Sequence, residues 1–437
     1  MSGVSAPQSK LVLNAFAAYF ENSLTTADAV SWKMYDGEMS DTNRLQVVEQ
    51  VVPNYVVTQT DNGVADLSGG PQGSVFGGEL FTVNKSFGTS MGWGDFEAIQ
   101  TMGDARESNA LKSAARNLAE QIDYYVLQVA TLASNNWTGT VTANISDQND
   151  VVSAYTRLKE EGVEDGDMRY IMNWTDRQLL GDQVINLPGP DGFPTDTYKE
   201  GFNSKVNGVP SMFTQQLPTL TVGTRTASGA AQVNGAAENV NYADVANQTS
   251  TNGWYMTQEL DVKNMTNGHT IKAGEVFSID GVYAYDNRKQ ALVSPARLQQ
   301  FTVVTGTPLS GTTGTIRIFP AIIVPNTGTG DNVDINTAHA TVGSVPADSA
   351  PITWLGTASS TIAPRLLIQK QAVVCNTQQL RLPVTGVGMR RKLEKVPLSV
   401  RMWANSDWGT GFYGVRFDLM LNANIRDRRR VCRFNGS

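Results

Sequence analysis

The sequence predicts an α+β protein in which a separate all-β unit is inserted into a larger helix-and-sheet body. Three observations indicate this fold class. Apolar residues recur at helical spacing over 111–132. Valine-rich, strand-like segments lie on both sides of that stretch. Between 223 and 350 the composition changes, and short strand-like segments alternate with turn residues, a pattern typical of a small barrel or sandwich.

Size and composition limit the function classes. A chain of 437 residues is long enough for two to four domains at ~100–200 residues each. Charged residues make up only 17%, and 40 glycines favour a β-rich globular protein over a disordered one. The net charge of −7 provides no overall positive field for nucleic acid. Two cysteines, Cys375 and Cys432, cannot form a disulfide framework and are expected as reduced thiols.

The first 40 residues favour an arm. Their opening lacks a charged start followed by a long apolar run, so we expect no secretory signal. No stretch of ~18 apolar residues occurs, so we expect no membrane-spanning helix. A short amphipathic helix is predicted before a polar passage that packs poorly into a core, from the spacing of Leu13, Phe16, Phe20 and Leu24.

A long hairpin is predicted next. Segments 44–60 and 80–92 are strand-like, and a glycine-rich loop, 61–79, separates them. This excursion has little apolar content to bury against its own domain, so another surface must cover it. Gly69 and Gly70 in the loop need flexible or positive-φ backbone, and we assign them as candidate assembly contacts.

The long helix is the clearest local signal. We expect about 30 residues starting near Asp104, with Asp104 and Glu107 near the positive end of the helix dipole. At 1.5 Å per residue its length is roughly 45 Å, well above the usual helix. A core helix of an ordinary domain would show the same periodicity. Its apolar stripe consists of Leu111, Ala115, Leu118, Ile122, Tyr125, Val129 and Leu132.

The rest of the chain divides by composition. Residues 149–222 have a mixed α/β pattern. Residues 225–253 contain few bulky apolar side chains and are expected as a long exposed loop within the inserted unit, 223–350. Apolar strands return in 351–395, and two or three long strands are predicted in 396–437.

One pattern matches a catalytic motif. Gly88 to Gly92 fits the G-x-S-x-G nucleophile elbow, with Ser90 as nucleophile. A serine hydrolase would need His269 or His339 as base. No helical pattern follows the motif directly, so a glycine-serine turn is favoured, and both histidines are expected at the surface or in turns rather than as ligands. No P-loop, dinucleotide fingerprint, zinc-protease or EF-hand motif is present, so no catalytic, cofactor or metal residues are predicted.

Two basic clusters occur late in the chain, at 389–395 and 426–433. Their guanidinium groups suit either phosphates or carboxylates of a neighbouring subunit. No aromatic residues are interleaved to stack on bases, which favours pairing between subunits over sequence-neutral contact with DNA. The candidate assembly contacts here are Arg428, Arg429 and Arg430, flanked by Arg426 and Arg433.

The order of these parts resembles the major capsid protein of tailed bacteriophages. It is most similar to the coat proteins of short-tailed Salmonella-type phages, which carry an insertion domain. Residues 111–130 resemble the family's spine helix, and 77–88 resemble the strand leading to it. Residues 198–224 resemble the passage before the insertion, and 271–304 resemble the insertion barrel. The 225–253 loop and the basic tail have no counterpart in the resemblance.

The resemblance implies the tailed-phage major-capsid fold with an inserted β-barrel. It implies an N-terminal arm, an E-loop, a peripheral P domain built on the spine helix, an axial A domain and an insertion domain. The corresponding segments are 1–40 (arm), 41–100 (E-loop and flanking strands), 101–139 (spine helix), 140–222 and 351–395 (A domain), 223–350 (insertion) and 396–437 (C-terminal P-domain strands).

The resemblance also implies a function. Subunits would form pentamers and hexamers of an icosahedral virion shell around double-stranded DNA, held without sequence-specific binding. Assembly in the bacterial cytoplasm would pass through a scaffold-dependent procapsid that expands on maturation. The implied partners are the chain itself, a scaffolding protein, a portal protein and, as a further candidate, a decoration protein; no enzyme activity, cofactor or membrane is implied. The alternatives are a serine hydrolase using Ser90 and a nanocompartment shell of the same fold.

Overall fold

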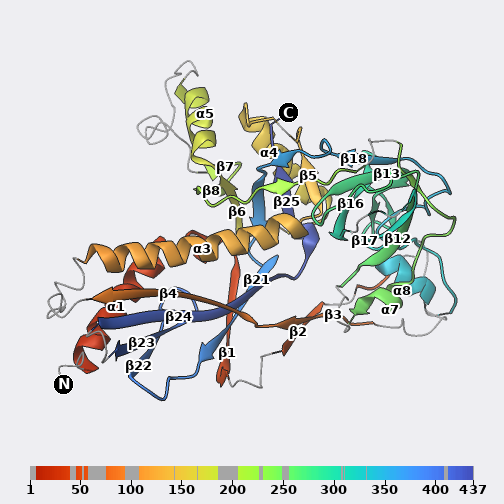
Figure 1. Cartoon of the computed structure of the whole chain (residues 1–437). Helices are drawn as coiled ribbons and strands as arrows, with labels where there is room; N and C mark the ends of the chain where they lie inside the picture. Colours follow the sequence, from red (N-terminus) through yellow and green to blue (C-terminus); the bar gives the residue numbers. More distant parts are fainter. Residues whose placement is uncertain are drawn as a thin grey trace.

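The computed structural model shows an elongated molecule with the helix α3, Asn109–Ala133, along one end and a compact β unit at the other (Figure 1). Gly69 and Gly70 lie outside the described residues, and their proposed role stays a prediction. The described residues are 6–39, 46–51, 54–57, 75–93, 108–141, 143–164, 166–185, 205–225, 230–248, 255–306, 309, 311–330, 332–407 and 412–436.

The predicted long helix is present as α3, Asn109–Ala133. Ser108 begins it, because its side-chain oxygen accepts a hydrogen bond from the backbone N–H of Leu111 at 3.4 Å. The helix therefore starts later than the predicted Asp104, whose surroundings are not described. Its 25 residues bury the predicted stripe from Leu111 to Ile122, and Tyr125 continues the stripe half-buried.

A sheet lies under α3 and forms the largest core with it. The N-terminal helix α1, Ala6–Ser23, packs on the same face of the sheet, and the Phe16 ring stacks on Phe417 with centroids 3.8 Å apart. The strand order is β1-β21-β24-β23-β22, with β4 also paired to β24. The strands are β1 (Ser31–Met39), β4 (Lys85–Trp93), β21 (Val373–Leu380), β22 (Val387–Lys392), β23 (Ser399–Asp407) and β24 (Phe412–Ile425).

A buried carboxylate fixes the arm to the long helix. Asp123 on α3 accepts hydrogen bonds from the backbone N–H groups of Thr25 and Thr26 at 2.8 and 3.0 Å. The Thr26 hydroxyl donates to the same carboxylate at 2.6 Å. Both threonines belong to the 3-10 turn η1, Thr25–Asp28, which follows α1. Burial raises the pKa of Asp123, and these hydrogen bonds oppose the rise.

A second sheet follows the C-terminal end of α3 and carries its own core. Its order is β5-β25-β20-β6-β8-β7, and β20 lies antiparallel to both β25 and β6. Arg365 on β20 donates to the buried carboxylate of Asp176 at 2.6 and 2.8 Å. The elements are β5 (Asn136–Thr138), α4 (Gln148–Glu160), β6 (Met168–Met172), α5 (Trp174–Ile185), β7 (Lys205–Val206), β8 (Val209–Phe213), β20 (Arg365–Gln369) and β25 (Val431–Phe434).

The β unit is a third sheet with a separate apolar core. The alternating burial along β12 shows that one of its faces is covered and the other exposed. Its order is β10-β12-β17-β16-β13-β18. The strands are β10 (Gln232–Val233), β12 (Gln258–Lys263), β13 (Val276–Tyr283), β16 (Leu298–Thr305), β17 (Gly314–Phe319) and β18 (Ile352–Leu355). Shorter elements beside it are α7 (Tyr242–Ala246), β14 (Tyr285–Asp286), β15 (Ala291–Leu292) and α8 (Asn332–Ala338).

The prediction of a long exposed loop over 225–253 was wrong. Strand β10 and helix α7 lie in this range, and Tyr242 is completely buried. Ala231 and Val233 are also completely buried. The segment has few large apolar residues, but those it has are inserted into the cores of the β unit.

The predicted segments do not coincide with the sheets, because strands of one segment lie in different sheets. Strands β21 and β22, from 351–395, lie in the sheet of β23 and β24. Strand β25, from 396–437, lies in the second sheet. The division of the chain into arm, E-loop, P, A and insertion segments therefore stays a prediction, and its boundaries do not fall between sheets.

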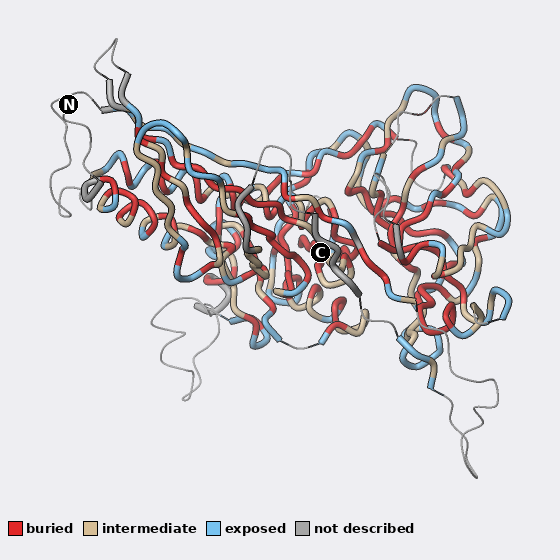
Figure 2. Tube along the Cα trace, turned by 90° about the horizontal axis from the view of Figure 1, so that it is seen from below, coloured by how far each residue is buried: buried red, intermediate tan, exposed pale blue. Residues whose placement is uncertain are grey.

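The hairpin strands are β2, Gln46–Val51, and β3, Gly77–Thr82, and they run antiparallel. They pass along the underside of the molecule toward α7 (Figure 1). Strand β3 also pairs in parallel with β11, Asn247–Gln248. Burial is concentrated in the elongated body and again in the β unit (Figure 2). Among the described residues, no helix combines the length and apolar character needed to cross a membrane.

Candidate functional site at the junction of the three sheets

The predicted arginine cluster forms a tight turn at the centre of the molecule. The turn η2, Arg428–Arg430, lies between β24 and β25. Asp427 accepts from the backbone N–H of Arg429 at 3.1 Å, from its Nε at 3.2 Å, and from Arg430 Nε at 3.2 Å. Arg430 also donates to Gln369 Oε1 at 2.7 Å. Burial opposes ionisation of Asp427, but Arg429 and Arg430 outweigh it and hold its pKa below the usual value.

Arg433 connects the end of α3 with the β unit. Its side chain is completely buried and donates to the backbone oxygens of Gly274 at 2.6 Å and Ser134 at 2.9 Å. Its guanidinium carbon lies 4.9 Å from the centre of the Trp137 ring. Burial lowers its pKa to about 9. Two carbonyl oxygens and an aromatic face thus replace the water that the cation loses.

The contacts of the predicted assembly arginines lie within the chain. Arg428 is buried with its guanidinium carbon 5.5 Å from the centre of the Phe319 ring, and Arg429 and Arg430 pair with Asp427. The predicted contact of these three arginines with a neighbouring subunit is untested and stays a prediction. Arg428 contacts Phe319 of the β unit and Arg430 donates to Gln369 of the second sheet, so the turn as a whole joins these two parts.

Two side chains of β16 bind the backbone that follows α3. Gln300 donates from Nε2 to the Trp137 carbonyl at 3.0 Å and accepts from the Trp137 N–H at 2.8 Å. Thr302 donates from its hydroxyl to the Ser134 carbonyl at 2.9 Å. An amide side chain here makes the paired bonds that a neighbouring strand would make, so the β unit is positioned relative to the spine helix by direct contacts.

The chain crosses into the β unit near 222 and out of it near 357, and the two crossings are held together. Strands β9, Leu220–Thr221, and β19, Thr361–Ile362, pair beside them. Arg225 Nε and Glu275 Oε2 are 3.0 Å apart, and both side chains are 1% exposed. Glu275 also accepts from the N–H of Gly223 at 2.8 Å. Arg225 donates to the Gly356 carbonyl at 2.6 Å, so one ion pair holds the entering and the leaving chain.

The base of the hairpin rests on the β unit. The N–H of Asn54 donates to His339 Nε2 at 3.3 Å, and the His339 ring stacks on Tyr242 with centroids 3.6 Å apart. A Cβ added to Gly77 would overlap the Tyr255 ring, so only glycine fits at this position of β3 against that ring. His339 lies in a turn, as predicted, but it is buried and not at the surface. Burial and the nearby Arg429 lower its pKa to about 4.

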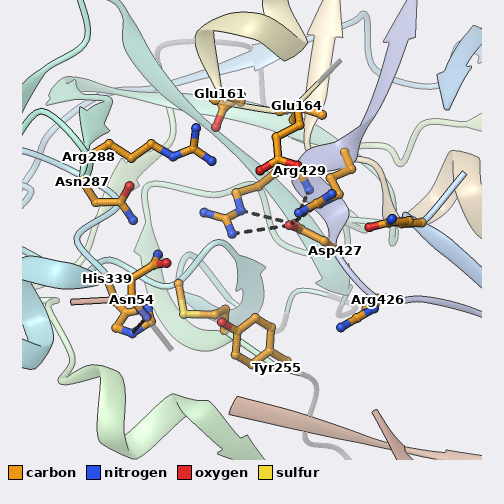
Figure 3. Close-up of a pocket in the computed structure, with 15 residues that line it drawn as sticks. Asn54, Glu161, Glu164, Tyr255, Asn287, Arg288, His339, Arg426, Asp427 and Arg429 are labelled. Atoms are coloured by element: carbon orange, nitrogen blue, oxygen red, sulfur yellow. Dashed lines mark hydrogen bonds and ion pairs between the residues drawn. The ribbon is translucent and has the colours of Figure 1, made fainter. Parts of the chain in front are cut away.

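A polar cavity of about 380 Å³ opens among these elements (Figure 3). Side chains from the hairpin base, the end of α4, the β unit and the arginine turn meet there. Among the described residues, no group of histidine, cysteine, aspartate or glutamate side chains is placed to hold a metal ion. The lining includes Asn54, Glu161, Glu164, Tyr255, Asn287, Arg288, His339, Arg426, Asp427, Arg429 and Arg430.

The hydrolase motif has the wrong geometry. Gly88 to Gly92 lie within the extended strand β4, and Ser90 pairs with Arg416 in the middle of a β ladder. A nucleophile elbow requires a sharp turn from strand to helix at the serine. The motif is therefore a strand segment in which small residues occur by composition, and it gives the serine hydrolase no support.

A family model described as P22 coat protein, gene protein 5, matches residues 5–429. The chain belongs to this family. The predicted recognition and the predicted tailed-phage major-capsid fold are thereby confirmed, and this coat protein is a structural subunit of a phage capsid. Membership in the coat family favours a non-enzymatic role and a phage shell over the nanocompartment alternative.

Comparison with solved structures gives distant likenesses. The coat protein is 10% identical to the capsid of cyanophage P-SCSP1u, covering 94% of this chain and 87% of that one, with a TM-score of 0.42. It is 9% identical to a chain from Mycobacterium phage Che8, covering 92% and 96%, with a TM-score of 0.38. It is 10% identical to the mature capsid protein of bacteriophage PhiM1, covering 93% and 85%, with a TM-score of 0.39. No curated protein matches the sequence.

Several residues of this junction were missed by sequence reasoning. Gln300 is 163 positions from Trp137, and Arg225 is 50 positions from Glu275, so no local pattern connects them. One signal was available and unused. Asp427 lies inside the arginine cluster, and a single acid among arginines indicates pairing within the turn.

Proposed function

We propose that the coat protein assembles as pentamers and hexamers into an icosahedral head that encloses double-stranded DNA. Assembly starts with a procapsid formed on a scaffolding protein, and the shell expands on maturation. A portal protein occupies one vertex, and a decoration protein is a further candidate partner. The family supports the shell role, and the chain's net charge of −7 supports DNA enclosure without tight adhesion to the wall.

The observation that carries this proposal is the apolar surface of the hairpin. Side chains near its base are strongly exposed: Tyr55 is 56% exposed, Phe76 53% and Val57 79%. Strand β2 lies at the edge of the small sheet β11-β3-β2. Exposed apolar side chains beside an open strand edge are a surface for another chain. The neighbouring subunit in a ring is the occupant that the capsid fold supplies.

The first test is sedimentation velocity of the purified chain, with negative-stain microscopy of any fast fraction. Shells, tubes or capsomer-sized rings are expected, either alone or after addition of a scaffolding protein. A monomer that persists at every concentration with a scaffolding protein present would refute the proposal.

A matched pair of variants tests the surface. Tyr55→Ser removes an exposed aromatic ring from the hairpin base, and Tyr283→Ser removes one of 40% exposure from the β unit. We expect Tyr55→Ser to slow assembly while its monomer melts as the parent does. We expect Tyr283→Ser to assemble as the parent does. Equal assembly of both variants would show that the hairpin base is not a subunit contact.

A further inference from the structure

The cavity at the junction has features of a ligand site that shell assembly does not require. Its volume of about 380 Å³ lies in the range of small-molecule sites. Four arginines line it, Arg288, Arg426, Arg429 and Arg430, and they come from two separate parts of the fold. Arg288 follows β14 in the β unit, whereas the others follow β24.

The carboxylates around the cavity are already shared among several cations. Asp427 faces two guanidinium groups, those of Arg429 and Arg430. Glu161 lies 2.9 Å from Arg297 and 3.4 Å from Arg157. Glu160 also lies 3.1 Å from Arg297, so the charges around Glu161 balance. Asp427 alone faces two guanidinium groups, and the excess positive charge therefore lies at the arginine turn. Glu164 is the remaining carboxylate of the described lining, and its side chain is exposed to solvent.

Arg288 is the cation that these acids do not neutralise. Its side chain makes no hydrogen bond or ion pair with the described residues. Its backbone is fixed, because its N–H donates to Asp286 Oδ1 at 3.0 Å. Its guanidinium carbon lies 3.6 Å from where a Cβ of Gly162 would be, at the end of α4. The guanidinium thus reaches across the junction, and it extends toward the space that Arg429 also enters (Figure 3).

Titratable groups around the cavity report the same positive potential. Burial raises the pKa of Glu161, but Arg157 and Arg297 outweigh it and the net pKa is lowered. The pKa of Asp427 is lowered in the same way by Arg429 and Arg430. Burial lowers the pKa of His339, and Arg429 lowers it further. Cations therefore outweigh burial at Glu161 and Asp427, whereas burial is the larger cause at His339.

We propose that the cavity binds a small oxyanion of the phosphate class, held between Arg288 of the β unit and Arg429 of the arginine turn. Planar guanidinium groups donate paired hydrogen bonds to tetrahedral and carboxylate oxyanions, and the two forks here approach from different parts of the fold. A bound anion bridges the β unit to the second sheet. The cavity is too small for duplex DNA, so the ligand is a free ion or the phosphate at the end of a strand.

Calorimetric titration of the full chain with inorganic phosphate tests this proposal, against sodium chloride of equal ionic strength. Saturable binding is expected, with a rise in the melting midpoint as phosphate increases. Arg288→Gln should weaken phosphate binding by about tenfold or more, since a charged hydrogen-bond pair is lost. Arg288→Lys should weaken it less because the charge remains.

The control is Arg381→Gln, which removes an exposed arginine that follows β21 and does not line the cavity. It should leave phosphate binding unchanged. Displacement of phosphate by a 5′-phosphorylated trinucleotide, but not by its unphosphorylated form, would assign the anion to a strand end; displacement by neither assigns it to a free ion. No saturable binding above chloride, or equal binding by Arg288→Gln and the parent, would overturn the proposal. These outcomes do not depend on shell assembly.

Discussion

Breaking the ion pair between Arg225 and Glu275 should destabilise the β unit and its connection to the body. The substitution Glu275→Gln removes the negative charge and keeps an oxygen. That oxygen still accepts from the N–H groups of Gly223 and Lys272, each at 2.8 Å in the parent. The variant therefore tests the loss of the negative charge without the loss of these two hydrogen bonds. Arg225 is left as a cation whose side chain is 1% exposed.

The magnitude follows from that burial. Removing one partner of a buried ion pair costs about 3–5 kcal/mol, because the other charge has lost its water. The Gly356 carbonyl, at 2.6 Å, and the Trp354 ring, whose centre lies 4.9 Å from the Arg225 guanidinium carbon, still contact the cation. We therefore expect the lower end, about 3 kcal/mol of unfolding free energy. The double variant Arg225→Met, Glu275→Gln leaves no orphan charge and should recover about 2 kcal/mol of that loss.

Urea unfolding followed by tryptophan fluorescence measures these differences, since Trp354 lies beside the pair. Glu259→Gln is the matched control: it removes an equivalent charge from an ion pair with Arg317, but the Glu259 side chain is 65% exposed. The control should shift the unfolding midpoint little. The pair does not join the two crossings if Glu275→Gln lowers the free energy of unfolding no more than the control does. The same conclusion follows if the double variant is less stable than Glu275→Gln alone.

Three further predictions concern the hairpin and its contacts with the β unit. Gly77→Ala should displace β3 from the Tyr255 ring and speed hydrogen exchange in the hairpin strands, which mass spectrometry would detect; unchanged exchange contradicts the contact. His339 has a folded pKa of about 4 against 6.5, so its stabilising effect is complete above pH 6.5 and is lost as pH falls toward 4, by roughly 3 kcal/mol. A His339→Gln variant should lose this dependence in denaturant titrations across that range. Proline at Gly69 and Gly70 should impair assembly more than monomer folding, measured by sedimentation; normal shells from both would reject that loop as a subunit contact.

The elements that depend on local spacing were predictable from the sequence. The stripe from Leu111 to Ile122 repeats at the helical period, and α3 buries it. The start of the helix was misplaced because acids at 104 and 107 were taken as the signal, whereas Ser108 makes the capping bond. Local patterns report which face of an element is buried, and they do not report its neighbours.

Sheet membership and the junction could not be predicted in the same way. Strand β24 pairs with β4, more than 300 residues earlier, and nothing in either segment identifies the other. His339 was predicted at the surface or in a turn because small and polar residues surround it. Its burial depends on the Tyr242 ring, which lies nearly a hundred positions away and stacks on it. These contacts are set by tertiary topology, which a single sequence does not contain.

Among the described residues, several separate contacts tie the β unit to the rest of the molecule, and three of them bear on the hairpin and the spine helix. The Arg225–Glu275 pair holds its two crossings, Gln300 holds the backbone after α3, and His339 holds the hairpin base. If the shell expands as proposed and the hairpin moves, the hairpin must either break its contacts with the β unit, from Asn54 to His339 and from β3 to β11, or carry the β unit with it. Moving the β unit would also strain the hydrogen bonds between Gln300 and Trp137 at the end of the spine helix. The geometry thus couples the hairpin to the spine helix through the inserted unit, and hydrogen exchange on expanded and unexpanded shells would distinguish the two routes.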